Sequence, residues 1–276
     1  MKIAVTGSTG LLGKYLLRLP DMIGTGGSGV DITDLPTITD AISSIRPDWI
    51  IHAAALTNVD FCERNPRDSV LVGILGTENV MLAAAHFGAR VLFVSTDSVF
   101  DGEKGCYSET DAVKPINRYA RHKTVSESIV LSNRENIVIR TNFFGVGGKS
   151  YTDWLMRELS GGAVSVFSDS TWSPIYAGHL AQLMLDSIHS GLSGIYHVSG
   201  SEPITKYDFA VQMKNLLGLN GNVVPVPVSS VNLAARRPKN TSLDCRKFEA
   251  NIGVSLGNAN QELLALAKEL GIDARI

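Results

Sequence analysis

Cysteine is scarce in this 276-residue chain, and its three cysteines, Cys62, Cys106 and Cys245, lie far apart. No CxxC pair occurs, which argues against a disulfide framework and against a structural zinc site. A reducing compartment is therefore expected. The opening MKIAVTGSTG has no signal-peptide pattern, and we find no apolar run that predicts a membrane span. We expect a cytoplasmic protein without a membrane partner.

An excess of basic charge is also lacking. The formal net charge is −2, so no broad basic surface is predicted to hold a nucleic-acid backbone. The six histidines show no metal-ligand spacing such as HExxH, and no GxSxG elbow is present. These absences argue against nucleic-acid binding, a metal centre and serine hydrolase chemistry.

Short apolar runs alternate with helical stretches over the first 145 residues. The runs predict buried strands at 2–6, 49–53, 91–95 and 137–141. The stretches between them predict helices at 11–19, 38–45, 69–87 and 117–132. Apolar strands without alternation, separated by helices, indicate a parallel sheet that is covered on both faces. We therefore predict an α/β fold with a Rossmann-type, doubly wound parallel sheet.

Glycines and prolines interrupt the pattern after Gly145. Shorter helices are predicted at 151–159, 179–188, 206–217 and 260–270. We interpret residues 1–145 as mainly a dinucleotide-binding part. Residues 146–276 are interpreted as mainly a smaller, mixed substrate-binding lobe that is interleaved with the sheet, so that both form one structural unit.

A glycine triplet lies between the first predicted strand and helix, at Gly7, Gly10 and Gly13. The first glycine permits a tight turn, the second lets the backbone approach a pyrophosphate, and the third lets helix and strand pack closely. The spacing is GxxGxxG, and such triplets are sometimes only turns. Its position after a strand and before a helix nevertheless predicts dinucleotide binding.

The choice between NADH and NADPH stays open. An acidic residue at the end of the second strand would bind the ribose 2′-hydroxyl, but the segment 24–28 reads GTGGS. Lys14 or Arg18 could instead face a 2′-phosphate. Asp31 could contact the adenine, or it could cap the approach to the next helix.

Tyr119 and Lys123 are spaced to share one helix face. An ammonium beside a phenol is expected to lower the pKa of the tyrosine, which would make Tyr119 a proton donor or acceptor for a carbonyl–alcohol pair. Ser95, Thr96 and Asp97 follow a predicted strand, at the sheet edge where ligands bind. A hydroxyl there could hold a carbonyl oxygen, although a solvated helix face and a local turn are the simpler alternatives.

These features make the sequence resemble the extended short-chain dehydrogenase/reductases, and within them the dTDP-4-dehydrorhamnose reductase family. The resemblance extends over nearly the whole chain, and the segment at 236–244 is its most specific part. It rests on TGSTGLLGKYL (6–16), VDITD (30–34), RPDWIIHAAALTNVDFCE (46–63), STDSVFDG (95–102), Tyr119 with Lys123, IRTNFFG (139–145) and RRPKNTSLD (236–244).

The resemblance implies three overlapping groups of site residues. The cofactor group is Gly7, Gly10, Leu11, Leu12, Asp31, Ile32, Ala53, Ala54, Ala55, Thr57, Tyr119 and Lys123. The catalytic group is Thr96, Tyr119 and Lys123. The substrate group is Thr96, Asp97, Phe143, Arg236 and Arg237. The two guanidinium groups would clamp a pyrophosphate, unless they belong to a solvated surface loop.

The implied function is reduction of a 4-keto group on a nucleotide-linked 6-deoxysugar by NADPH or NADH. Three residues depart from the family pattern: Ser98 replaces a tyrosine, Phe143 a tryptophan and Gly73 an asparagine. Two alternatives therefore stay open. One is a nucleotide-sugar epimerase or dehydratase of the same superfamily, and the other is a non-catalytic NADP-binding subunit resembling the methionine adenosyltransferase beta subunit. A homodimer is neither predicted nor excluded.

Overall fold

The fold is described from a computed structural model that covers residues 1–26, 29–147 and 150–272. Gly27 and Ser28, which belong to the predicted ribose segment, lie outside the described residues.

Six parallel strands form the central sheet. Their order is β10 (Gly194–His197), β5 (Ile137–Thr141), β4 (Arg90–Thr96), β3 (Trp49–His52), β1 (Ile3–Thr6) and β2 (Met22–Gly24). Successive side chains point to opposite faces, and in β1 Ile3 and Val5 enter one core cluster while Ala4 enters the other. Both faces are therefore buried, and the predicted doubly wound Rossmann-type sheet is confirmed.

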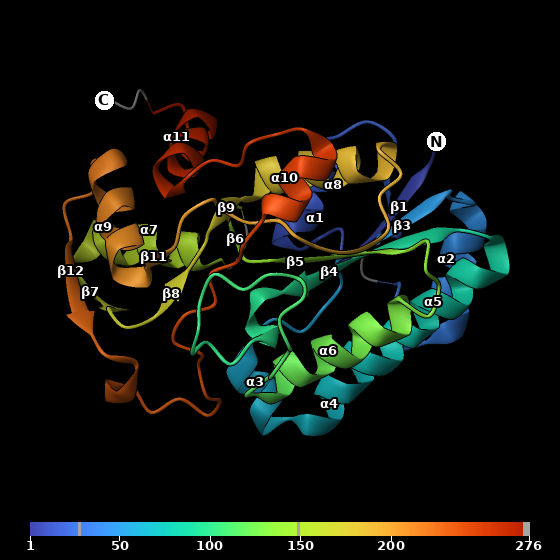
Figure 1. Cartoon of the computed structure of the whole chain (residues 1–276), viewed down its shortest axis with the longest axis horizontal. Helices are drawn as coiled ribbons and strands as arrows, with labels where there is room; N and C mark the ends of the chain where they lie inside the picture. Colours follow the sequence, from blue (N-terminus) through green and yellow to red (C-terminus); the bar gives the residue numbers. More distant parts are fainter. Residues whose placement is uncertain (27–28, 148–149, 273–276) are drawn as a thin grey trace.

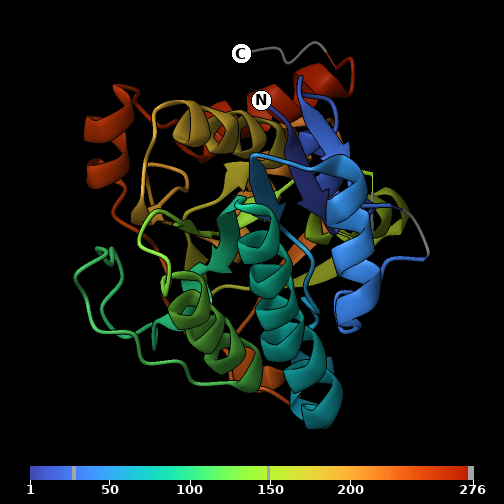
Figure 2. The ribbon, with the colours of Figure 1, turned by 90° about the vertical axis from the view of Figure 1, so that its right-hand side faces the viewer.

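Helices cover both faces of this sheet (Figure 1). One face carries α1 (Leu11–Leu16) and α8 (Ala177–His189), which contact each other. The other carries α2 (Leu35–Ile45), α5 (Gly76–Phe87) and α6 (Arg118–Val130). Figure 2 shows these last three helices side by side, in agreement with the α2–α5 and α5–α6 contacts.

One helix is longer than its neighbours. It joins α4 (Pro66–Val70), a π-helical turn η1 (Leu71–Leu75) and α5, and it spans 22 residues from Pro66 to Phe87. Among the described residues it is the one helix that is long and apolar enough to cross a membrane by length and composition. The expectation that no apolar run reaches this length is therefore wrong. In this fold the helix packs against α2 and α6, and these contacts account for part of its apolar surface.

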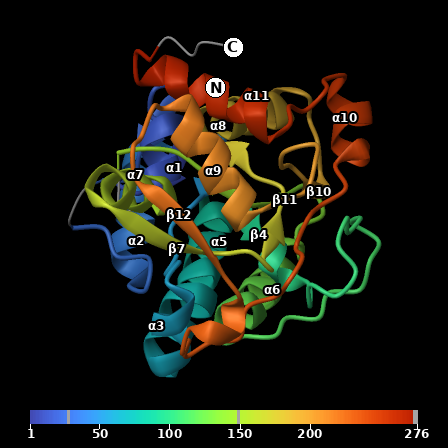
Figure 3. The same cartoon turned by 90° about the vertical axis from the view of Figure 1, so that its left-hand side faces the viewer.

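A lobe lies beside the sheet (Figure 3). It contains α7 (Tyr151–Gly161) and α9 (Lys206–Leu216), together with three two-stranded sheets. These sheets pair β7 (Ala163–Phe167) with β12 (Asn222–Val226), β8 (Thr171–Trp172) with β11 (Ile204–Thr205), and β6 (Phe143–Phe144) with β9 (Ile175–Tyr176). Four of these strands, β6, β8, β9 and β11, have two residues and carry no periodicity, which is why the sequence did not predict them.

The C-terminal helix α11 (Ala259–Glu269) binds back onto the first helix. Glu269 accepts hydrogen bonds from the hydroxyls of Tyr15, at 2.7 Å, and Tyr176, at 2.6 Å. Arg18 pairs with the same carboxylate at 2.5 Å. This Glu269 junction ties the end of the chain to the helix that follows the glycine loop.

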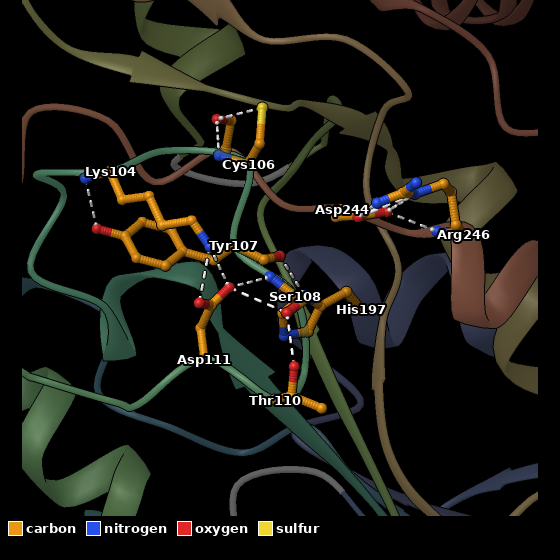
Figure 4. Close-up of polar contacts among 10 residues, drawn as sticks. Lys104, Cys106, Tyr107, Ser108, Thr110, Asp111, His197, Asp244 and Arg246 are labelled. Carbon is orange, nitrogen blue, oxygen red and sulfur yellow. Dashed lines mark hydrogen bonds and ion pairs between the residues drawn. The ribbon is translucent and has the colours of Figure 1, made fainter.

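A long connection precedes α6, and hydrogen bonds fix its shape (Figure 4). Asp111 accepts from Lys104 Nζ and from the Ser108 amide, both at 2.7 Å. His197 Nδ1 donates to the Tyr107 carbonyl at 2.9 Å, and burial lowers the pKa of this histidine to about 3, so its ring is neutral. These hydrogen bonds therefore hold the connection in one conformation where it leads into the first turn of α6.

Candidate active site

A cleft of about 1100 Å³ opens at the carboxyl ends of the strands, where ligands bind in open α/β sheets. It is large enough for a dinucleotide and a further small ligand. Most of the residues predicted for the site line this one cleft. They are Gly7, Gly10, Leu11, Leu12, Asp31, Ile32, Ala53, Ala54, Ala55, Thr57, Thr96, Tyr119, Lys123 and Phe143.

Gly7 and Gly13 pack so closely against the neighbouring backbone that neither position has room for a side chain. Gly7 has φ +69°, and a Cβ there would stand 2.7 Å from the Ala54 nitrogen. A Cβ on Gly13 would stand 2.6 Å from Ser8 Cα. No side chain caps the first turn of α1, so its backbone N–H groups stay available to the cleft. These residues fit the diphosphate of a nicotinamide dinucleotide.

We predict that Gly7→Ala lowers the free energy of unfolding by about 2–5 kcal/mol, because it combines left-handed backbone strain with a clash against the backbone that follows β3. NADPH binding, followed by fluorescence titration, should be lost with it. Gly88→Ala is the matched control, since Gly88 has φ +70° and nothing within 4 Å of the added Cβ. If both variants lost the same free energy of unfolding and the same NADPH affinity, the close packing at Gly7 would contribute neither to stability nor to binding.

The two cations considered for a 2′-phosphate are engaged elsewhere. Lys14 donates to the Gly147 carbonyl and Arg18 pairs with Glu269. Neither residue lines the cleft. The prediction that Lys14 or Arg18 faces the ribose is therefore wrong, because both side chains fasten α1 to later parts of the chain.

Asp31 lines the cleft and forms a local turn at the same time. Its Oδ1 accepts from the Thr33 amide at 2.8 Å and from the Thr33 hydroxyl at 2.9 Å. The residue that caps α2 is Asp34. The turn at Asp31 lies on the approach to α2, as one of the two expectations had it, and a contact with the adenine stays a proposal.

Tyr119 and Lys123 lie one turn apart on α6. The helix is capped by Asn117, whose side chain accepts from the Ala120 amide at 3.0 Å. Lys123 is buried, and its Nζ donates to the Val94 carbonyl at 2.8 Å. The ammonium therefore stands at the end of β4, and both side chains reach the same cleft.

Burial dominates the acid–base chemistry of this pair. It raises the pKa of the Tyr119 phenol, and the nearby Asp97 charge adds to this, whereas a hydrogen bond with the Thr96 side chain opposes it. The expected lowering of the Tyr119 pKa by Lys123 is therefore wrong. Burial also lowers the pKa of Lys123 to about 8, against the opposing effect of Glu127. Tyr119 is thus protonated at neutral pH and able to donate.

We predict a basic limb in the pH profile of kcat/KM. With the pKa of Lys123 at about 8, the ammonium form is full below this pH and falls about tenfold per unit above it. The profile should decline accordingly, as measured by steady-state rates from pH 6 to 10. Lys123→Arg keeps a charge throughout this range and should lack the limb. A wild-type plateau up to pH 9.5 would contradict the role.

Thr96 and Asp97 have different positions, although both were predicted to border the substrate. Thr96 lines the cleft and donates to Asp97 Oδ1 at 3.1 Å. Asp97 is 1% exposed, does not line the cleft, and accepts from Asn142 at 2.8 Å and Thr241 at 2.5 Å. Its carboxylate therefore joins the end of β4 to the C-terminal segment from behind the cleft wall.

The arginine pair lies outside the lining of the cleft. Arg237 binds Asp60 at 2.6 Å and the Ala235 carbonyl at 2.8 Å. Arg236 is exposed, and its carbonyl accepts from Asn117 at 3.0 Å. Neither arginine lines the cleft, so their clamp on a pyrophosphate stays a proposal.

Sequence reasoning missed several residues that line the cleft. Asn142 could have been found because it lies within IRTNFFG, whereas nothing in the spacing pointed to Tyr151. The missed residues include Ser8, Thr9, Thr25, Val94, Thr141, Asn142, Ser150 and Tyr151.

Gly73 lies in the π-helical turn, where the resembled family has asparagine. A small cavity of about 20 Å³ separates it from Tyr119 and Lys123. A Cβ on Gly73 would stand 3.1 Å from His122 Cβ. The glycine therefore leaves space for His122, whose Nδ1 lies 2.7 Å from the Ser69 hydroxyl.

The fold and the site define an NAD(P)-dependent oxidoreductase. A family model described as the RmlD substrate binding domain matches residues 1–272, and the chain belongs to this family.

Proteins similar to this chain include dTDP-4-dehydrorhamnose reductases and a subunit of another enzyme, methionine adenosyltransferase 2 subunit beta. A dTDP-4-dehydrorhamnose reductase of Aggregatibacter actinomycetemcomitans is 30% identical, over 92% of this chain and 94% of that protein. The crystal structure of dTDP-4-dehydrorhamnose reductase from Bacillus anthracis in complex with NADP superimposes with a TM-score of 0.92 at 29% identity, covering 98% of this chain and 100% of that one. Methionine adenosyltransferase 2 subunit beta of Xenopus tropicalis is 30% identical, over 91% of this chain and 82% of that protein.

Proposed function

We propose that the protein reduces the 4-keto group of a nucleotide-linked 6-deoxysugar with NADPH or NADH, as a dTDP-4-dehydrorhamnose reductase. The observation that carries this proposal is one cleft that holds both a side-chain-free glycine cradle and the Tyr119–Lys123 pair. The family and the reductases similar over nearly the whole chain support it. We further assign the chain to the short-chain dehydrogenase/reductases.

The protein's own residues orient the substrate and move the proton. Bound NADPH or NADH supplies the hydride that reaches the carbonyl carbon. The Tyr119 hydroxyl donates its proton to the carbonyl oxygen, since its raised pKa keeps it protonated. Thr96 lies beside Tyr119 and holds the same oxygen. Lys123 donates one N–H of its ammonium group to the Val94 carbonyl. Its other N–H groups remain for the ribose hydroxyls of the cofactor.

The proposal also includes a cellular location, a division of the chain into two parts and an assembly state. Cys62, Cys106 and Cys245 are free thiols, which supports the cytoplasm as the location. We divide the unit into a dinucleotide part, residues 1–145, and a substrate lobe, residues 146–276. A homodimer is consistent with the exposed Leu75 and Leu82 on the long helix.

The test titrates NADH and NADPH against a panel of nucleotide-linked 4-keto sugars and follows the loss of nicotinamide absorbance. One equivalent of reduced cofactor should be consumed for each sugar. Turnover without net consumption would instead identify an epimerase or a dehydratase.

The similarity to a methionine adenosyltransferase beta subunit favours one second candidate, a cofactor-binding regulatory subunit. It predicts NADP binding without reduction of any sugar in the panel, together with co-purification of a catalytic partner. The intact Tyr119–Lys123 pair favours the reductase.

A further inference from the structure

Lys206 is placed by a short antiparallel ladder. It directly follows β11, in which Ile204 lies opposite Trp172 of β8. The Lys206 amide also donates to the Ser170 carbonyl at 2.8 Å. This pairing aims the lysine side chain across the ladder at Trp172.

The ammonium lies against aromatic rings and not against an acid. Lys206 Nζ is 2.9 Å from the ring centre of Trp172 and 5.0 Å from that of Tyr151. The two rings meet edge to face at 6.0 Å. Cation–π contacts offset part of the cost of desolvating the charge. Within the described ranges, Nζ has neither an ion-pair partner nor a hydrogen-bond acceptor.

The nearest negative charge cannot act as the partner of Lys206. Asp97 is close enough to raise the pKa of Lys206, although burial lowers it to about 7 overall. Its carboxylate oxygens are already occupied by hydrogen bonds from Thr96, Ser98, Asn142 and Thr241. Lys206 is half-buried, and a partly desolvated cation without a counter-ion is costly unless a ligand supplies the charge.

Two further donors beside Lys206 are unsatisfied. The Tyr151 hydroxyl and Trp172 Nε1 are both buried and have no hydrogen-bond partner in the described parts of the chain. Burial raises the pKa of Tyr151, so its hydroxyl is protonated. Tyr151 also lines the cleft. The cluster thus presents an ammonium, a phenol and an indole N–H, which call for an acceptor with negative charge.

We propose that Lys206, Tyr151 and Trp172 form an anion subsite that meets the cleft at Tyr151, and that its ligand is the diphosphate of the sugar nucleotide. This inference rests on the proposed function. An ammonium is a suitable point-charge partner for phosphate oxygens, and the Lys206 ammonium lies within range of the charge of Asp97, the neighbour of Thr96. The subsite therefore anchors the diphosphate while the sugar extends toward Tyr119.

The experiment measures binding and needs no turnover. The NADP-loaded protein is titrated calorimetrically with thymidine, uridine and guanosine diphosphates and with the corresponding nucleosides. Lys206→Met keeps an apolar side chain of similar length and should weaken diphosphate binding about 10- to 100-fold, with nucleoside binding unchanged. Lys206→Arg should retain part of the affinity. Lys214→Met on the same helix α9 is the matched control and should bind like the wild type.

Three binding results would overturn the subsite. The first is Lys206→Met binding every diphosphate as tightly as the wild type. The second is an equal loss of nucleoside binding, which would mark a packing role, and the third is absence of diphosphate binding by the wild type. If Lys206 controls diphosphate binding but no keto sugar is reduced, the proposed function fails and the subsite stands. If sugars are reduced and KM is unchanged in Lys206→Met, the subsite alone fails.

Discussion

Replacing Tyr119 with phenylalanine should lower kcat for sugar reduction by about 10²- to 10⁴-fold, the range for loss of general acid catalysis. The phenol is the protonated donor that reaches the cleft beside Thr96. The rate is measured by cofactor oxidation at saturating substrate. NADPH affinity should change little, because the glycine cradle does not involve the hydroxyl.

Tyr107→Phe is the control for this substitution. The Tyr107 hydroxyl also makes hydrogen bonds, to Asp101 at 2.6 Å and from the Lys104 amide at 3.0 Å, but it lies outside the cleft lining. Its loss should affect stability and leave kcat within about twofold. Undiminished turnover by Tyr119→Phe would remove the tyrosine from the mechanism.

Arg140→Met should lower the free energy of unfolding by about 3–5 kcal/mol, the usual cost of leaving one member of a buried ion pair alone. Arg140 on β5 binds Glu127 on α6 through Nε at 2.9 Å and Nη2 at 2.7 Å, and both side chains are 4% exposed. Removing the guanidinium leaves a buried carboxylate without its partner. Urea unfolding measures the loss.

The double variant Arg140→Met/Glu127→Leu separates charge burial from packing. It should recover most of the lost stability, because an apolar pair of similar volume is often as stable as the buried ion pair. Arg157→Met provides the surface comparison, since Arg157 and Glu158 are 69% and 40% exposed, and should cost less than about 1 kcal/mol. A double variant no more stable than Arg140→Met would contradict this explanation.

The sequence was most informative where apolar runs are long. The strands β1, β3, β4 and β5 lie within one or two residues of the predicted ranges, because strands buried on both faces read as continuous apolar segments. The lobe was predicted only through its helices. Four of its paired strands have only two residues, which is too short to leave a local signal.

The site residues also divide into those with a local sequence signal and those that depend on tertiary contacts. Residues on the glycine loop and on the face of α6 were predictable, since short-range spacing fixes them. The ion pair of Arg237 with Asp60 joins residues 177 positions apart, and the position of Lys206 over Trp172 depends on a two-residue ladder. The reversed pKa shift of Tyr119 also had no sequence signal, because it results from burial.

The Glu269 junction has a consequence for synthesis of the chain. The helix that completes the cofactor cradle is made first, yet its Tyr15, and Arg18 just beyond its end, find their carboxylate partner only at residue 269. The sixth strand of the sheet, at 194–197, is also synthesised long after the first strand, which starts at residue 3. A nascent chain on the ribosome therefore cannot assemble the complete nucleotide half until translation is almost finished, and truncation near the C-terminus would leave the first helix without this anchor.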